Sequence, residues 1–124
     1  MKNNRWLKLG GAVVLALTMV WLAVPTGVTA PTTVTLTASV QDQVCQGGNA
    51  VNVTLTATLQ PPQQNVRYSW DFENDGIFDT APNPNPTVAH LYPDETNVTA
   101  RVRVQKGTRS AEDTVTFTTR RCGG

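Results

Sequence analysis

Three observations predict an all-β fold. We expect an antiparallel sandwich of about seven strands that follows a separate N-terminal segment. Apolar and polar residues alternate with a period of two along most of residues 34–119, as in strands with one buried face. Runs rich in Pro, Asn, Asp and Gly separate these stretches. Two cysteines lie near the two ends of the alternating region.

The first thirty residues have the layout of an export signal. The basic residues Lys2, Arg5 and Lys8 come first. An uncharged apolar run over residues 9–24 follows, and residues 28–30 are small enough for a signal peptidase to accept. Pro31 is a poor first residue after cleavage, so an uncleaved membrane anchor is the alternative. We favour release, with a signal or anchor at residues 1–30 and the domain at residues 31–124.

The composition of the expected domain argues against nucleic acid as a partner. The chain has ten basic and nine acidic residues, but three of the basic ones lie in the leader. Residues 31–124 therefore keep seven basic and nine acidic side chains, a formal charge of −2. Nucleic-acid binding normally requires a basic excess on one face. A membrane is expected as a partner only if the leader stays uncleaved.

The first two strands are expected at residues 34–40 and 51–59. Threonines occupy most of the alternate positions, which suits a half-exposed pleated surface. The predicted inward residues are Val34, Leu36, Ala38, Val40, Val51, Val53, Leu55, Ala57 and Leu59. Two prolines then break the pattern, so residues 60–65 are expected to form a loop.

The third strand carries the large aromatic residues of the expected core, and the later strands are aliphatic. Val66, Tyr68, Trp70 and Phe72 form its inward series. Further strands are expected at residues 88–92, 98–104 and 111–119, the last with Val115 and Phe117 inward. Asn74-Asp75-Gly76 predicts a turn, Lys106-Gly107 a hairpin, and the Pro-Asn repeat at residues 81–86 a surface segment.

Cys45 and Cys122 are the two cysteines of the chain, and we expect them to form a disulfide. An even pair in an exported domain is typical of a disulfide, whereas two buried free thiols are the alternative. The spacing and the single histidine, His90, do not suit a metal site. If the first and last strands run side by side in the same direction, their ends bring both cysteines to one pole.

The sequence resembles the PKD family, the immunoglobulin-like module named after the polycystic kidney disease protein. The resemblance covers about residues 34–117. Its most specific parts are Tyr68-Ser69-Trp70-Asp71-Phe72, Asp75-Gly76, Pro86 and His90-Leu91-Tyr92. The glycine and tyrosine that usually follow are replaced by Thr96 and Val98, although the aliphatic alternation continues. The resemblance implies an extracellular, non-catalytic module with roles in adhesion, protein or carbohydrate contact, or spacing.

The acidic turn is the best candidate site in the sequence. Asp71, Glu73, Asp75 and Asp79 surround Gly76 and partly match the start of a calcium-binding loop. Pro82 stands where such a loop has its bidentate Glu, so calcium, the one cofactor considered, would bind weakly. The alternative is a turn whose carboxylates face water.

Two other groups of residues have a functional and a structural interpretation. Arg101 and Arg103 project from one sheet face, with Arg67 near them, and suit an acidic sugar or a carboxylate-bearing partner. Outward arginines more often keep a sheet soluble. His90 is expected to be a hydrogen-bonded structural residue, and no nucleophile has a plausible base beside it.

These residues favour a non-catalytic exported module that binds a protein or polysaccharide outside the cell or at its surface, the periplasm included. A spacer or assembly subunit without a ligand of its own is the alternative. An exposed aromatic or acidic cluster at one pole would favour binding, and self-association would favour assembly.

Overall fold

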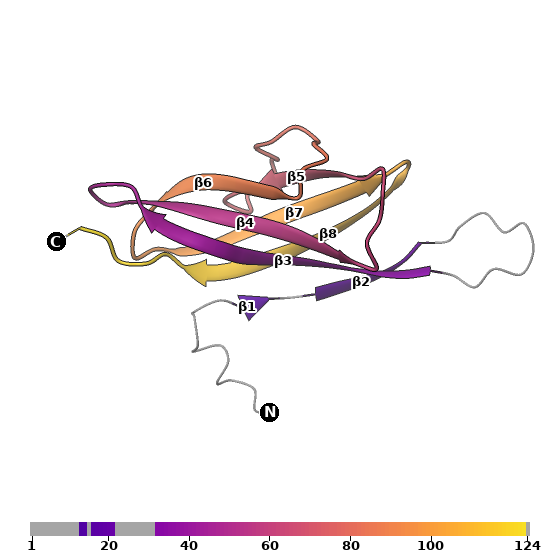
Figure 1. Ribbon diagram of the computed structural model, residues 1–124, viewed down its shortest axis with the longest axis horizontal. Helices are drawn as coiled ribbons and strands as arrows, with labels where there is room; N and C mark the ends of the chain where they lie inside the picture. Colours follow the sequence, from indigo (N-terminus) through magenta and orange to yellow (C-terminus); the bar gives the residue numbers. More distant parts are fainter. Residues whose placement is uncertain (1–12, 15, 22–31, 124) are drawn as a thin grey trace, which may run out of the picture.

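A computed structural model describes residues 13–14, 16–21 and 32–123, with side chains from Thr33 onward. The described residues form eight strands in two four-stranded sheets, ordered β1-β8-β7-β5 and β2-β3-β4-β6 (Figure 1). The bounds are β1 Val13–Val14, β2 Ala16–Trp21, β3 Thr32–Cys45, β4 Ala50–Gln60, β5 Arg67–Asp71, β6 Thr87–Pro93, β7 Asn97–Lys106 and β8 Arg109–Thr118. All neighbouring strands are antiparallel, which confirms the predicted sandwich.

The expected export segment at residues 1–30 lies mostly outside the described residues, and it stays a prediction. Its described residues are extended strands: β1 pairs with Val115 and Thr116 of β8, and β2 pairs with residues 32–37 of β3. Within the described ranges, no helix has the length and apolar character needed to cross a membrane.

The core follows the predicted alternation of apolar residues. The inward positions of β3, β4, β7 and β8 are almost completely buried, and Val40 and Val88 pack against them as partly buried residues. Trp70 is 2% exposed and has Tyr68 and Phe72 on the same side of the chain, as predicted. β8 adds an unexpected core residue, because Asp113 falls in the inward series between Ala111 and Val115 and is also buried.

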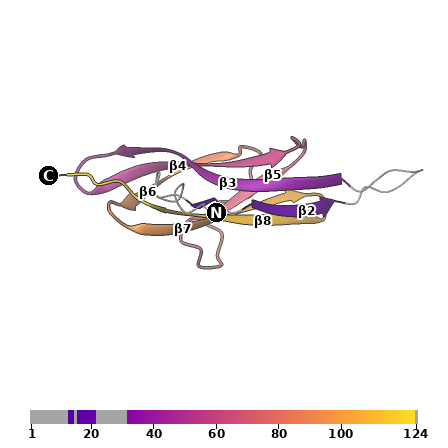
Figure 2. The same cartoon turned by 90° about the horizontal axis from the view of Figure 1, so that it is seen from below.

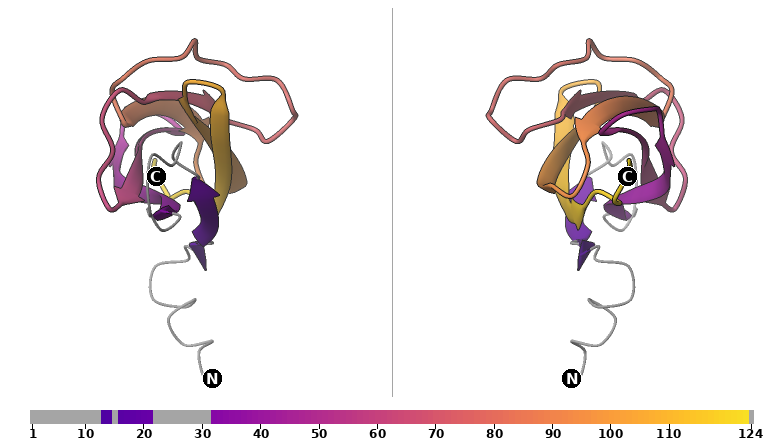
Figure 3. Two further views of the ribbon diagram at one scale, coloured as in Figure 1. Left: turned by 90° about the vertical axis from the view of Figure 1, so that its right-hand side faces the viewer. Right: turned by 90° about the vertical axis from the view of Figure 1, so that its left-hand side faces the viewer.

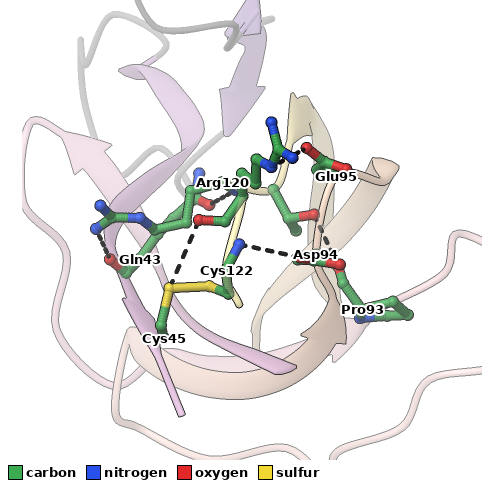
Figure 4. Close-up of a disulfide and its surroundings, with 9 residues drawn as sticks. Gln43, Cys45, Pro93, Asp94, Glu95, Arg120 and Cys122 are labelled. Atoms are coloured by element: carbon green, nitrogen blue, oxygen red, sulfur yellow. Dashed lines mark hydrogen bonds and ion pairs between the residues drawn. A yellow bond between two sulfur atoms is a disulfide. The ribbon is translucent and has the colours of Figure 1, made fainter. Parts of the chain in front are cut away.

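The predicted disulfide joins the ends of β3 and β8 at one pole. β3 and β8 run in the same direction in Figure 1, so Cys45 and Cys122 reach the same end of the sandwich. Their Cα atoms are 5.7 Å apart and their sulfur atoms are bonded. Asp94 accepts a hydrogen bond from the Cys122 backbone N–H at 2.9 Å, which fixes the C-terminal segment beside the disulfide (Figure 4).

The connection between β5 and β6, residues 72–86, projects beyond the sheets (Figures 2 and 3). Its returning part runs along the outer edge of β5. Tyr68 and Asn83 exchange two backbone hydrogen bonds of 2.7 and 3.0 Å there, and the Asp79 N–H donates to the Trp70 carbonyl at 2.7 Å. This segment contains the candidate site.

Candidate functional site

Asp71, the last residue of β5, holds the acidic turn closed from within. Its carboxylate accepts hydrogen bonds from the backbone N–H groups of Asp75 at 3.1 Å and Gly76 at 2.8 Å. Asn74 and Gly76 both have positive φ, 55° and 91°, which bends the chain tightly enough for these contacts. Burial alone would raise the pKa of Asp71, but the hydrogen bonds from Gly76 and Asp75 outweigh it and lower the pKa.

Asp71 is completely buried, which differs from the alternative of a turn whose carboxylates face water. The turn folds back over the outer face of the β5-β7-β8 sheet, where Asn74 Oδ1 accepts a hydrogen bond from Arg101 Nε at 2.8 Å. Phe78 lies over the guanidinium of Arg103, 4.2 Å from the ring centre. These long-range contacts hold the turn against β7, and short-range sequence patterns do not reveal them.

Asp79 fixes the returning side of the turn. Its Oδ2 accepts a hydrogen bond from the Phe72 backbone N–H at 2.8 Å. Thr80, the next residue, accepts one from the Trp70 N–H through its hydroxyl at 2.9 Å. The start and end of the turn are thus joined side by side at the edge of β5.

The structure brings together three of the four predicted cation ligands. One carboxylate oxygen from each of Asp71, Glu73 and Asp79 lies within 4.8 Å of the other two. The fourth, Asp75, is exposed and accepts a hydrogen bond from the Ile77 N–H at 2.9 Å. Burial and the negative charges of Asp79 and Asp75 raise the pKa of Glu73. A cation bound at the three oxygens would relieve this repulsion.

His90 belongs to an aromatic cluster beside these acids. Its ring stacks on Phe72 with centroids 4.0 Å apart and meets the edge of Tyr92 at 4.7 Å. The His90 Nε2 atom lies 3.8 Å from Glu73 Oε2, and burial lowers the pKa of His90. In the described residues the His90 side chain is held by stacking rather than by the hydrogen bonds that the sequence predicts. Tyr92 provides the hydrogen bond instead, donating to the Phe72 carbonyl at 2.8 Å.

A groove of about 270 Å³ opens beside this cluster, between β6 and the first residues of β7. β5 ends at Asp71 opposite Arg101, so it does not cover the start of β7. The groove is lined by the aromatic cluster, Glu73, Leu91 and the polar residues 96, 97 and 99. Leu91 is 55% exposed at its rim. The β6–β7 groove therefore combines apolar surface, an acidic group and two strand edges.

The two predicted binding arginines are engaged within the protein. Arg101 Nη1 lies 2.7 Å from Glu112 Oε1, and Arg103 Nε lies 2.9 Å from Glu112 Oε2. Burial opposes the ionised form of Glu112, but the two arginines outweigh it and lower its pKa. Sequence reasoning missed Glu112, although the hairpin turn after Lys106 fixes the register that places it opposite Arg103. Arg67 is exposed on β5.

A second opening, of about 300 Å³, lies on the side of the sandwich between β5 and β6. Its lining includes Tyr68, Trp70, Asn83 and Asn85, and it contains no charged residue. In the part of the chain that the structure describes, Trp70 Nε1 is buried without a hydrogen-bond partner. This side cavity and the β6–β7 groove both adjoin the β5–β6 connection.

Comparison with known proteins gives one match. The model of the PKD domain family matches residues 18–119, so the match begins inside β2 and includes the acidic turn, the groove and the side cavity. No curated protein and no solved structure matches the chain significantly.

Proposed function

The chain belongs to the PKD domain family, and from this we propose that it is an exported, non-catalytic module that binds a protein or polysaccharide at or outside the cell surface. PKD domains are immunoglobulin-like modules that generally lack catalysis. The family and the Cys45–Cys122 disulfide indicate an extracellular or surface location. The finer assignment, binding at a defined surface, depends on the geometry of the β6–β7 groove.

The observation that carries this proposal is the combination of groups in the β6–β7 groove. Leu91 and the aromatic cluster offer apolar contact, and Glu73 offers an acceptor for a hydroxyl or a basic group of the ligand. The edge of β6 that faces away from β4 can also receive hydrogen bonds from an extended ligand. Arg101 and Arg103 are weaker candidates, because both already pair with the carboxylate of Glu112.

The surroundings of the single histidine support a non-catalytic role. His90 stacks against Phe72 and Tyr92 and lies 3.8 Å from Glu73, and none of these neighbours has a hydroxyl or thiol within hydrogen-bond distance of the ring. A hydrolytic site needs a nucleophile within hydrogen-bond reach of its base. His90 therefore fits a role in shaping the groove.

We also propose that the acidic turn binds calcium weakly through Asp71, Glu73 and Asp79. The clustered oxygens and the raised pKa of Glu73 support this ligand set, which leaves out Asp75. Asp71 and Asp79 already accept backbone hydrogen bonds, so each has only its remaining lone pairs for a cation. Such a partial set corresponds to affinities of about 10⁻⁴ to 10⁻³ M.

The alternative is a spacer or assembly subunit, and one observation favours it. β3 begins at one pole of the elongated sandwich, and the chain ends at the opposite pole (Figure 1). A module that the chain enters at one pole and leaves at the other can be linked in series. This arrangement would extend a larger assembly without any ligand in the groove.

A binding comparison separates the two functions. The double variant Glu73→Gln/Leu91→Ser changes the groove, and Val44→Ser removes a similarly exposed apolar side chain from β3 as the matched control. Each purified full chain is tested against the envelope fraction of host cells and a panel of immobilised polysaccharides. The proposal predicts that the double variant loses at least tenfold in apparent affinity and that Val44→Ser retains it. Equal behaviour of all three proteins would favour the spacer.

A further inference from the structure

One side of the sandwich is closed by a stretch of chain that pairs with both sheets. We call the side between β3 and β8 the seam. β1 pairs with β8 in one sheet, and β2, one residue further along, pairs with β3 in the other. The same stretch of chain therefore occupies the gap between the two sheets and runs antiparallel to both neighbours (Figure 1).

The rest of the free edge of β3 has other partners. The Ala38 N–H donates to Asp113 Oδ2 at 2.8 Å. Further along, Gln43 contacts the segment after β8, because the Arg120 N–H donates to Gln43 Oε1 at 2.7 Å, and the disulfide follows at Cys45. Residues 32–37 are thus the part of this edge that depends on β2.

The sequence of the stretch suggests that it does not stay in the exported protein. β1 and β2 lie within the uncharged run at residues 9–24 that predicts an export signal. Its removal would leave two strand edges without a paired strand: the edge of residues 32–37 that faces away from β4, and the edge of Val115 and Thr116 that faces away from β7. The inward residues of that edge, Val34 and Leu36, are 2% and 0% exposed, so the vacated edge borders the core. An open edge of this kind is a template for another strand.

We propose that the seam is a strand-acceptor site: after removal of residues 13–21, it takes up an uncharged, apolar, extended segment of another exported protein. This proposal rests on the export proposed above and goes beyond it. The stretch that occupies the seam in the structure defines the chemistry of the incoming strand, which includes Val13, Val14, Leu17 and Val20.

The shape of the seam favours a free segment over a second copy of the folded domain. An occupant must lie between two sheets and pair with both. β3 of a second copy already pairs with its own β4, and the bulk of that sandwich prevents its insertion. An extended segment, paired only through its backbone, fits the gap.

The test uses the full chain with a protease site inserted in the connection at residues 22–31. The folded chain is cleaved there, and a synthetic peptide of residues 12–22 is added as the probe. The peptide carries Thr18→Cys and the chain carries Thr35→Cys, because Thr18 and Thr35 are partners in the register. A chain with Thr58→Cys on β4, where the residue is exposed, is the matched control. Cross-linking at residue 35 is expected to exceed that at residue 58 at least tenfold.

A second peptide, with Leu17→Pro and Val20→Pro in addition to Thr18→Cys, tests the backbone pairing. Successive N–H groups along a strand point to opposite sides. Because positions 17 and 20 are an odd number of residues apart, one of the two prolines removes an N–H donor that faces β3. We expect this peptide to cross-link at least tenfold less. Equal cross-linking by both peptides, or none by the first, would overturn the strand-acceptor site.

Two further outcomes would also overturn the proposal. If the cleaved chain forms dimers linked through Thr35→Cys of both copies, the occupant is a second copy. If the mass of the exported protein shows that residues 13–21 are retained, the seam keeps its own strand and the export processing fails as well. Neither of these two outcomes affects the binding test with the groove variant. The proposals for the groove and for the seam can therefore fail separately.

Discussion

The two long sides of the sandwich are closed in different ways. Along the β3–β8 side, backbone pairing with β1 and β2, one buried carboxylate and a disulfide join the sheets. Along the β5–β6 side, the connection at residues 72–86 covers the edge of β5, and the carboxylates of Asp71 and Asp79 hold it in place.

This difference places the exposed chemistry on one side. On the β3–β8 side, strand pairing satisfies the backbone groups, and the disulfide joins the ends of the two strands covalently. The β5–β6 connection is held by acidic side chains instead, Glu73 remains exposed at the groove, and Asp75 is exposed in the same turn. The β5–β6 side is therefore the better candidate for recognition of a polar ligand, whereas the β3–β8 side offers backbone pairing to an apolar strand.

The largest expected effect comes from the residue packed beneath the β5–β6 connection. Trp70→Ala should lower the free energy of unfolding by about 3–5 kcal/mol, because it removes a buried aromatic side chain from a small core. Urea denaturation measures this. Trp70→Phe is the control, since it keeps an aromatic ring and should cost clearly less. An equally stable Trp70→Ala protein would show that the inward register of β5 is wrong.

Breaking the β3–β8 closure should have the next largest effect. Cys45→Ala and Cys122→Ala should each cost about 2–4 kcal/mol, and the two losses should agree because either change opens the same loop. Thermal unfolding with and without reductant checks this. Reductant should lower the Tm of the wild type and leave both variants unchanged, and clearly unequal variants would contradict a shared role.

Asp71 and Asp75 sharpen the comparison within the acidic turn. Asp71→Ala should cost about 2–3 kcal/mol, because two backbone N–H groups lose a charged acceptor. Asp75→Ala should change stability by less than about 0.5 kcal/mol, since that residue is exposed. Urea denaturation of both variants at pH 7 measures the difference, and equal costs would mean that the turn is not organised around Asp71.

The lowered pKa of Asp71 adds a pH dependence with a defined sign. The ionised Asp71 carboxylate should contribute fully to stability well above its unfolded-state pKa of 3.8. This contribution should disappear as the pH falls through the lower pKa of the folded state. The wild type should therefore lose stability on acidification below about pH 4 more steeply than Asp71→Ala does. Parallel pH profiles would contradict this.

The sequence predicted the parts of the fold that depend on local periodicity. Alternation identified the buried faces of β3, β4, β5, β7 and β8, Trp70 included, and the compartment argument identified the disulfide. The burial of Asp71 was not predictable in this way, because the turn around it packs against β7 through Asn74 and Phe78, whose partners Arg101 and Arg103 lie 27 and 25 residues further along the chain. The burial of Asp113 could have been predicted from the sequence, since this residue occupies an inward position of β8. Its hydrogen bond with the Ala38 N–H could not, because Ala38 lies 75 residues away.

The smallest expected effect concerns calcium. With a dissociation constant of about 10⁻³ M, ~10 mM calcium should stabilise the wild type by about 1.4 kcal/mol and raise its Tm by several degrees. Glu73→Gln should abolish this rise, whereas Asp75→Asn should retain it, because Asp75 lies outside the cluster of three oxygens. Magnesium is the control cation and should do less. A Tm that does not respond to calcium would remove the cation from the proposal.

The central claim is that the Asp71 carboxylate closes the acidic turn without a bound cation and leaves the groove side of the turn available to a ligand. Amide hydrogen exchange in the presence of a chelator tests this claim most directly. The Asp75 and Gly76 N–H groups should be protected in the wild type and lose that protection in Asp71→Ala, while the amides of β7 and β8 keep theirs. Exchange of both amides at unprotected rates in the wild type, with protection restored by calcium, would contradict it.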